Sequence, residues 1–419
     1  MSGNFLGSGR KSASCTGIIF RLLSACLSFA FSIPVLHAGT VPALAAKSSI
    51  LMDATTGTVL YENDADLVIP PASLSKLMTI HVTLNAVASG KVRLEDSVEL
   101  TPATWASNQP WGSSLMFLAP GQKVSLRELL LGLAVASGND AAVAVALHVA
   151  GSVPAFAVLM NQEAAAMGLT QTQFVEPSGI SEHNLTTARD FISFCAQYLA
   201  RHPETLKEFH SVREFSYPKQ ENLPEQYWDK PGTIIQYNRN TLLGAMDGVD
   251  GLKTGYIIES GYNLAITAER NGTRLIAVLL GGPGASSTRG GRIRSDDGET
   301  LLKWGFDNFR TIRPVIGNLE PARVWKGKVN SVLLQPEGQL AFTAAMDRAT
   351  QVDYEVERNP VTEAPLKAGT ALGRLRFFDS RGELKSVRLL AASDVPAGNI
   401  LKRAMDSIAL FFLRLFRRV

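Results

Sequence analysis

Three short motifs of reactive and polar residues follow one another along this chain of 419 residues: Ser73-Leu74-Ser75-Lys76, Ser137-Gly138-Asn139 and Lys253-Thr254-Gly255. A serine hydroxyl is a weak nucleophile at neutral pH and must lose its proton as it attacks, so it needs a base nearby. A lysine three residues later supplies that base when the lysine is neutral. Taken alone, S-x-x-K arises by chance in a chain of this length, so the order and surroundings of the three motifs carry the prediction.

The residues around Ser73 predict the element that holds nucleophile and base together. Residues 70–72 end an extended run, and the apolar residues that follow recur with a helical period until Gly90. Ser73 therefore opens a helix, and Lys76 lies one turn later on the same face. Burial and a second cation, for which Lys253 is the candidate, would lower the pKa of Lys76. The alternative is a helix-capping serine followed by a solvated lysine.

The second motif interrupts two apolar helical runs, residues 126–136 and 141–151, which predicts a polar loop between core helices. Buried hydroxyl and amide groups cost free energy unless they find partners. Ser137 and Asn139 therefore either cap a helix or face a pocket. In the functional interpretation, Ser137 passes a proton to the leaving amine and Asn139 holds a carbonyl of the substrate side chain.

The third motif lies in a predicted strand, and a second strand follows at residues 262–268. Gly255 would let a ligand backbone approach this strand closely. An extended peptide along the strand would meet Lys253 and Thr254, whose charge and hydrogen bonds suit a terminal carboxylate. The alternative is an ordinary strand with an exposed lysine.

Together the motifs resemble those of D-alanyl-D-alanine carboxypeptidases of the low-molecular-mass penicillin-binding protein family, the type with a C-terminal membrane anchor. The resemblance covers nearly the whole chain after the leader and includes residues 71–79, 112–118, 120–121, 136–141, 187–190, 249–255, 261–264 and 301–306. It implies a mixed α/β fold of the penicillin-binding and serine β-lactamase type. It also implies removal of the terminal D-alanine from peptidoglycan pentapeptides through an acyl-enzyme, inhibition by β-lactams that mimic the dipeptide, and no cofactor or metal.

The resemblance assigns the chemical steps to the first two motifs. Ser73 would attack the carbonyl of the penultimate D-alanine with Lys76 as its base, and water would then release the peptide. Ser137 would relay the proton to the leaving amine, while Asn139 would hold the substrate.

Substrate binding and charge stabilisation fall to the third motif and its neighbours. Lys253 and Thr254, next to Gly255, would bind the substrate carboxylate, and the backbone N–H groups of Ser73 and Tyr256 would form the oxyanion hole. Arg294 aligns with a family arginine and would tune the charge near Lys253, although a surface arginine fits the sequence equally well. Tyr256-Ile257 replaces the His-Thr pair of several family members, which leaves the outer substrate contacts open.

Four other functions are alternatives to the carboxypeptidase. A class A β-lactamase carries S-D-N where this chain has S-G-N, and it would end more than a hundred residues earlier. A Ser-His-Asp hydrolase is poorly supported because the chain has no G-x-S-x-G turn. A D,D-endopeptidase acting on peptidoglycan cross-links and a penicillin-binding sensor with little turnover remain open alternatives.

The N-terminal sequence predicts export. Three basic residues precede an apolar stretch at residues 22–36, and small residues follow near Ala45, which is typical of a secretory signal peptide. Residues 23–26 also resemble a lipoprotein cleavage box, but the apolar segment mostly follows Cys26 instead of preceding it. We therefore predict a signal peptide at 1–45, a catalytic domain at 46–312, a small β-rich domain at 313–395 and a terminal helix at 396–419.

The terminal helix is predicted to be amphipathic. One arc carries Lys402, Arg403, Asp406, Ser407, Arg414, Arg417 and Arg418, with Leu410 and Leu413 as apolar exceptions, and the opposite arc is apolar. We expect it to lie on inner-membrane lipid at the periplasmic face of a bacterium, because basic residues attract anionic lipid and the charges oppose spanning. The alternative is a helix packed on the protein itself. The net charge of +3 rests partly on this tail and predicts no nucleic-acid partner.

Overall fold

The computed structural model describes residues 40–229, 232–349 and 351–417 of the chain. The predicted signal peptide lies almost entirely outside these residues, as do Cys15 and Cys26. Its predicted last residue, Ala45, is described. The backbone N–H groups of Ala45 and Ala46 donate to the carboxylate of Asp297 at 2.9 to 3.0 Å.

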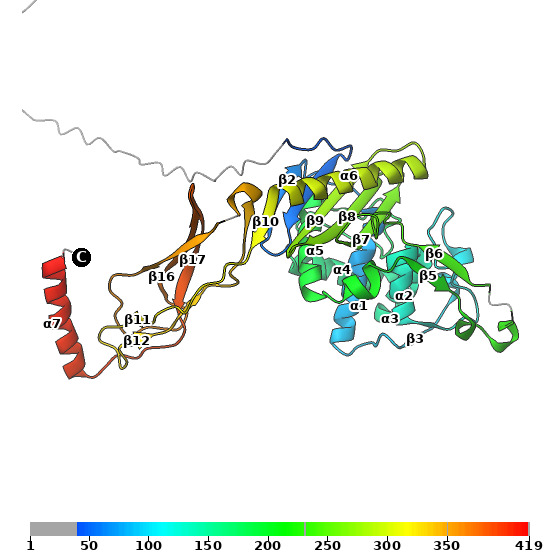
Figure 1. The fold of residues 1–419 in the computed structure, drawn as a ribbon. Helices are drawn as coiled ribbons and strands as arrows, with labels where there is room; N and C mark the ends of the chain where they lie inside the picture. Colours follow the sequence, from blue (N-terminus) through cyan, green and yellow to red (C-terminus); the bar gives the residue numbers. More distant parts are fainter. Residues whose placement is uncertain (1–39, 230–231, 350, 418–419) are drawn as a thin grey trace, which may run out of the picture. The chain divides into compact units, whose positions relative to one another are not determined.

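A five-stranded antiparallel sheet organises the larger part of the described chain, in the order β2-β1-β9-β8-β7 (Figure 1). Its strands are β1 (Ser48–Asp53), β2 (Thr58–Asn63), β7 (Val249–Ile257), β8 (Gly261–Arg270) and β9 (Thr273–Gly282). The central strands β8 and β9 are buried on both faces, so both faces of the sheet are covered.

One face of the sheet packs against α6 (Ser287–Asn308), and the other belongs to the main core (Figure 1). Gly298 and Gly305 of α6 lie against Leu264 and Leu275, so side chains of this register face the helix. The alternate residues of the same strands, such as Ala265 and Ile276, belong to the core shared with the helices. Because successive side chains of a strand point to opposite faces, one set packs against α6 and the other set packs in the core shared with the helices.

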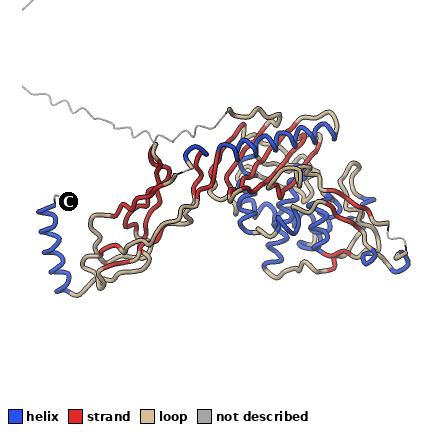
Figure 2. The backbone as a smooth tube through the Cα atoms, in the orientation of Figure 1, coloured by secondary structure: helices blue, strands red, loops and turns tan. Residues whose placement is uncertain are grey.

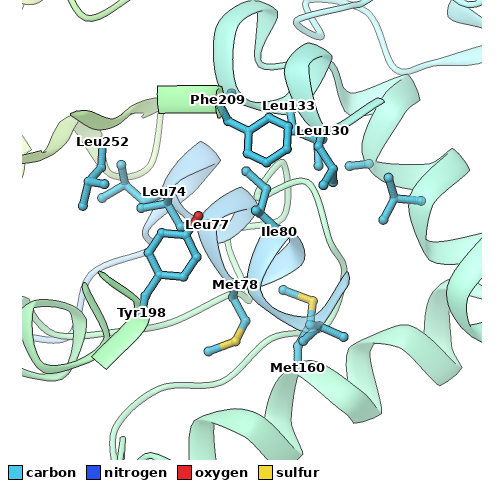
Figure 3. Packing of buried hydrophobic residues seen from close by; sticks show 14 of the residues in the cluster. Leu74, Leu77, Met78, Ile80, Leu130, Leu133, Met160, Tyr198, Phe209 and Leu252 are labelled. Atoms are coloured by element: carbon cyan, nitrogen blue, oxygen red, sulfur yellow. The ribbon is translucent and has the colours of Figure 1, made fainter. Parts of the chain in front are cut away.

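The helical part is assembled around α1 (Ser75–Ala88), which is buried on nearly all sides. The other helices are α2 (Leu126–Leu131), α3 (Asn139–Ala150), α4 (Val153–Ala166) and α5 (Ala188–Arg201). Figure 3 shows Leu77 and Ile80 of α1 among side chains such as Phe209 and Tyr198. A helix that is buried on nearly all sides is a core helix, so α1 is a rigid base for the serine that precedes it.

The C-terminal part is built from strands, as predicted. A four-stranded sheet has the order β13-β17-β16-β15, formed by β13 (Leu334–Pro336), β15 (Asp353–Arg358), β16 (Ala371–Asp379) and β17 (Gly382–Ala391) (Figure 2). Two further pairs join β10 (Phe309–Ile312) to β14 (Phe342–Ala345), and β11 (Ala322–Arg323) to β12 (Ser331–Val332). In β16, Arg374 and Arg376 alternate with apolar residues. A separate hydrophobic cluster underlies this part.

The chain ends in α7 (Ile400–Arg417), which confirms the predicted terminal helix. Its predicted polar arc contacts the β-rich part, because Asp406 accepts a hydrogen bond from the backbone N–H of Lys326 at 2.6 Å and Leu410 is only 3% exposed. The apolar arc points away, and Leu401 and Phe416 are 71% and 78% exposed. The mixed α/β fold, the all-β C-terminal part and the final helix are therefore confirmed.

Among the described residues, no single helix combines the length and the apolar character that crossing a bilayer requires. α3 and α4 reach these values only when they are taken as a pair, and the chain bends by 83° between them.

Candidate active site

Ser73 lies in a short 3-10 turn, Ala72–Leu74, that leads directly into α1. We predicted that Ser73 begins the helix. In the structure Ser73 lies in the 3-10 turn, and the α-helix itself begins two residues later, at Ser75. Ala72 has φ of +51°, a left-handed conformation that is unfavourable for an alanine and is held in place by its burial. The turn leaves Ser73 partly accessible while its neighbours are buried.

Lys76 is fully buried, and its ammonium nitrogen meets three oxygen atoms. Nζ lies 3.0 Å from Oγ of Ser73, 2.8 Å from Oδ1 of Asn139 and 2.5 Å from the carbonyl oxygen of Ser178. The first two motifs are thus in direct contact. The alternative of a solvated lysine is wrong for this site.

Burial lowers the pKa of Lys76 from its ordinary value of 10.5 to about 7. The negative charges of Glu176 and Asp140 oppose this shift, and the positive charge of Arg239 adds to it. The predicted coupling of the two lysines is present, because Lys76 and Lys253 repel each other, and Arg239 adds a further positive charge. Near neutral pH a substantial fraction of Lys76 is neutral and can accept a proton.

The second motif joins a single π-helical turn at Gly132–Ala136 to α3. Ser137 has φ of +62° and is buried, which fits the predicted polar loop between core helices. Asn139 does not cap α3: its side chain accepts from Lys76 and donates from Nδ2 to Oγ of Ser113 at 3.2 Å. Of the two predicted alternatives, the structure supports the one in which Asn139 faces a site.

Asp140, the residue after the motif, was not predicted to matter. Its buried carboxylate accepts hydrogen bonds from the backbone N–H groups of Met116, Phe117 and Leu118 at 2.8 to 3.0 Å. Burial raises the pKa of Asp140, and these hydrogen bonds counteract the rise. Asp140 thereby ties the segment at 113–118 to α3, and an acidic residue at a helix start is the only sequence signal for it.

The third motif lies in β7, as predicted, and its side chains are buried. Lys253 is 2% and Thr254 is 5% exposed, so the alternative of an exposed lysine is wrong. Nζ of Lys253 donates to the carbonyl oxygen of Thr254 at 3.1 Å. Burial lowers the pKa of Lys253, and the positive charges of Lys76, Arg239 and Arg294 lower it further. A nearby carboxylate would counteract this shift.

Gly255 brings β7 against the turn that carries Ser73. A Cβ atom at Gly255 would lie 2.8 Å from the carbonyl oxygen of Pro71 and 3.2 Å from the backbone nitrogen of Ser73. The close approach expected for a ligand backbone is therefore made by the protein's own backbone. This places the N–H of Ser73 beside the residue that precedes Tyr256.

A cavity of about 460 Å³ opens over this arrangement. It is lined by Ser73, Trp111, Gly112, Ser113, Ser114, Asn139, Gly179, Ile180, Tyr256, Ile257, Ile258 and Glu259. It therefore joins residues from all three motif regions around the accessible hydroxyl of Ser73. Trp111 and Tyr256 are 100% and 48% exposed, so aromatic surface borders the cavity.

Arg294 lines a neighbouring cavity of about 590 Å³, which also includes Arg239, Tyr256 and Tyr262. Its Nε is buried and has no hydrogen-bond partner among the described residues. The alternative that Arg294 is an ordinary surface arginine is therefore wrong. Burial and the charge of Arg239 lower the pKa of Arg294 to about 10. Arg294 in turn lowers the pKa of Lys253, in line with the predicted effect on the charge there.

The loop at 176–184 also belongs to the site, because Ser178 contacts Lys76. The carboxylate of Glu176 accepts hydrogen bonds from the N–H groups of Ser178 and Gly179, both at 2.6 Å. Asn184 donates from Nδ2 to Oγ of Ser75 at 3.1 Å, which fastens the loop to the start of α1. No motif marks these residues in the sequence, because their role depends on a contact across a hundred positions.

Comparison with known proteins agrees with this geometry. Residues 36–284 match the family model of D-alanyl-D-alanine carboxypeptidases, peptidase family S11, and residues 315–397 match that of the penicillin-binding protein 5 C-terminal domain. D-alanyl-D-alanine carboxypeptidase DacC of Escherichia coli strain K12 is 35% identical, over 90% of each chain. The sequence resemblance is thereby confirmed.

Solved structures are similar as well. Penicillin-binding protein 5 of Haemophilus influenzae is 32% identical with a TM-score of 0.75, and the match covers 85% of this chain and 99% of that one. Penicillin-binding protein D2 of Listeria monocytogenes, solved with ampicillin bound, is 30% identical with a TM-score of 0.52, over 63% of this chain and 98% of that one. The chain belongs to the D-alanyl-D-alanine carboxypeptidase family.

Proposed function

We propose that this protein is a serine-type D-Ala-D-Ala carboxypeptidase that removes the terminal D-alanine from peptidoglycan pentapeptides. The observation that carries the proposal is the 3.0 Å contact between Oγ of Ser73 and Nζ of Lys76, a lysine with a pKa of about 7. Such a lysine is a competent base for a serine nucleophile at neutral pH. Relatives over nearly the whole chain carry this activity in their names.

In the acylation step, Oγ of Ser73 attacks the carbonyl carbon of the penultimate D-alanine while Lys76 takes the hydroxyl proton. The peptide C–N bond then breaks, and the proton passes through Ser137 to the departing amine of the terminal D-alanine. The acyl group remains as an ester on Ser73. Water hydrolyses this ester and returns the free serine, so the proton balance is restored.

Binding of the terminal carboxylate falls to the third motif. Lys253 and Thr254 offer it charge and a hydroxyl, and Arg294 adds positive charge behind them. The backbone N–H groups of Ser73 and Tyr256 would hold the oxyanion, and each such donor is worth about 3 to 4 kcal/mol in the transition state. Asn139 would orient the substrate side chain from the opposite part of the cavity lining.

β-Lactams would inhibit the enzyme by acylating Ser73 in place of the peptide. The similarity to a penicillin-binding protein that was solved with ampicillin supports this proposal. The simplest test is covalent labelling by a fluorescent penicillin, followed by intact mass, with Ser73→Ala and the exposed control Ser107→Ala. We expect labelling to vanish only in Ser73→Ala, and undiminished labelling there would remove Ser73 as the nucleophile.

We also propose that the enzyme is exported and works at the periplasmic face of the bacterial inner membrane. The exposed apolar arc of α7 supports this proposal. A helix with one apolar face and one basic face can lie in the membrane interface, with the apolar side chains among the lipid tails and the basic ones at the headgroups. In this proposal residues 46–312 catalyse, residues 313–395 form a spacer, and residues 396–419 anchor the protein after removal of residues 1–45.

A further inference from the structure

The β-rich part and α7 enclose a cavity that the proposed reaction does not use. It has a volume of about 550 Å³ and is lined by Pro321, Ala322, Arg323, Trp325, Arg358, Asn359, Pro360, Val361, Thr362, Leu413 and Arg414. Three arginines thus come from separate segments: β11, the end of β15, and α7. An aromatic ring and aliphatic side chains complete the lining.

Backbone hydrogen bonds hold Trp325 of this cavity in position. Trp325 donates its backbone N–H to the carbonyl of Thr362 at 2.8 Å, and its own carbonyl accepts from the N–H of Ala364 at 2.8 Å. The guanidinium of Arg323 lies over the indole of Trp325, 3.9 Å from the ring centroid. Stacking of this kind orients the planar fork and leaves its N–H groups free to bind an anion.

Positive charge exceeds negative charge around the cavity. Arg358 pairs loosely with Glu320 at 3.7 Å, while Arg414 and Lys326 share the single carboxylate of Glu363 at 3.3 and 2.6 Å. Among the ion pairs formed by described residues, none includes Arg323, although its charge lowers the pKa of Asp406, which pairs with Lys402. The cavity therefore has binding capacity left for an anion with several oxygen atoms, as a phosphate has.

The cavity borders the exposed apolar face of α7. Leu413 and Arg414 belong to the lining, while Phe412 and Phe416, within one turn, are 49% and 78% exposed. A ligand with a phosphate and a long apolar tail would satisfy both surfaces at once, with its phosphate at the arginines and its tail along the phenylalanines. Free phosphate would use only the first surface.

We propose that this cavity binds the headgroup of an anionic phospholipid, so that the β-rich part itself contacts the membrane and orients the enzyme on it. The inference rests on the membrane attachment proposed above. It adds that attachment depends on lipid charge through residues outside α7. In this proposal the β-rich part binds anionic lipid headgroups and also acts as a spacer.

The test compares the leaderless protein with Arg323→Gln/Arg358→Gln and with Arg374→Gln/Lys385→Gln. The second pair is the matched control, because it removes the same charge from exposed positions of the same part that do not line the cavity. Co-sedimentation is measured with vesicles of phosphatidylcholine alone and with vesicles that also contain phosphatidylglycerol. Release of D-alanine from a soluble peptide verifies that each variant is folded and active.

We expect the cavity variant to lose affinity for the anionic vesicles by on the order of tenfold, and the control by less than about twofold. Neither should change on phosphatidylcholine alone. Equal affinities of cavity variant and wild type would overturn the headgroup site but leave the α7 anchor in place. A wild type that binds no vesicles would overturn both. If inorganic phosphate alone raises the Tm of wild type but not of the variant, and vesicle binding is equal, the ligand is a free anion and the lipid assignment is wrong.

Discussion

The carbonyl oxygen of Ser178 accepts a hydrogen bond of 2.5 Å from Nζ of Lys76. The loop that carries Ser178 therefore helps to fix the position of the proposed base. Glu176 holds this loop by accepting hydrogen bonds from the N–H groups of Ser178 and Gly179. Its negative charge also raises the pKa of Lys76. Nucleophile, base and loop consequently form one unit, and the loop residues are expected to influence catalysis although they need not touch substrate.

The rate of acylation should depend on pH through Lys76. Because its pKa is about 7, the neutral form that accepts the proton is in the majority above pH 7 and the ammonium form below it. We expect the rate of penicillin acylation to rise about tenfold per pH unit well below 7 and to level off above it. The measurement is a stopped-flow series across this range. A rate that is constant or falls with rising pH would contradict the role of Lys76.

Replacement of Glu176 should shift this pH profile. The negative charge of Glu176 stabilises the ammonium form of Lys76, so Glu176→Gln should move the midpoint of the profile to lower pH. The exposed Glu182 lies in the same loop, and Glu182→Gln is the matched control. A merely structural role for Glu176 would lower the rate at every pH without moving the midpoint.

Gly179 should be intolerant of a side chain. A Cβ atom there would lie 1.8 Å from the carbonyl oxygen of Ala72 and 2.9 Å from the backbone nitrogen of Ser73. Gly179→Ala should therefore displace the nucleophile and slow acylation by on the order of a hundredfold. Gly168 has a similar φ, +75° against +79°, but open space around it, so Gly168→Ala shares the backbone strain alone. Equal rates in the two variants would contradict this account.

Removal of the chain after Gly398 should separate catalysis from membrane attachment. The truncated enzyme lacks α7 and its exposed apolar arc but keeps every residue of the proposed active site. We expect it to release D-alanine from a soluble peptide within about twofold of the full protein, and to remain in solution when vesicles are sedimented. Sedimentation of the truncated protein with vesicles would show that α7 is not the anchor.

The parts of the site that could be predicted are those encoded locally. A spacing of three residues determines that Lys76 reaches Ser73, and a strand pattern identifies the element that carries Lys253. The fold class and the terminal helix followed from periodicity and from the family resemblance. The sequence indicated that another backbone comes close to Gly255, but it could not show which one. In the structure the neighbouring backbone is that of the turn at Ala72–Leu74.

The parts that could not be predicted depend on contacts between distant residues. Asp140 binds backbone groups more than twenty positions away, and Glu176 acts on Lys76 across a hundred positions. No local pattern marks such acceptors, because most of their hydrogen bonds are to main-chain groups of any residue type. Likewise, the positive charge of Arg239 lowers the pKa of Lys76, and no local pattern in the sequence connects these two residues.

The most direct test of the central claim is the release of free D-alanine from a pentapeptide ending in D-Ala-D-Ala, measured for the leaderless protein and for Ser73→Ala. We predict turnover by the wild type and none above background for the variant. Absence of release by a wild type that is still labelled by penicillin would contradict the carboxypeptidase and favour an endopeptidase or a sensor.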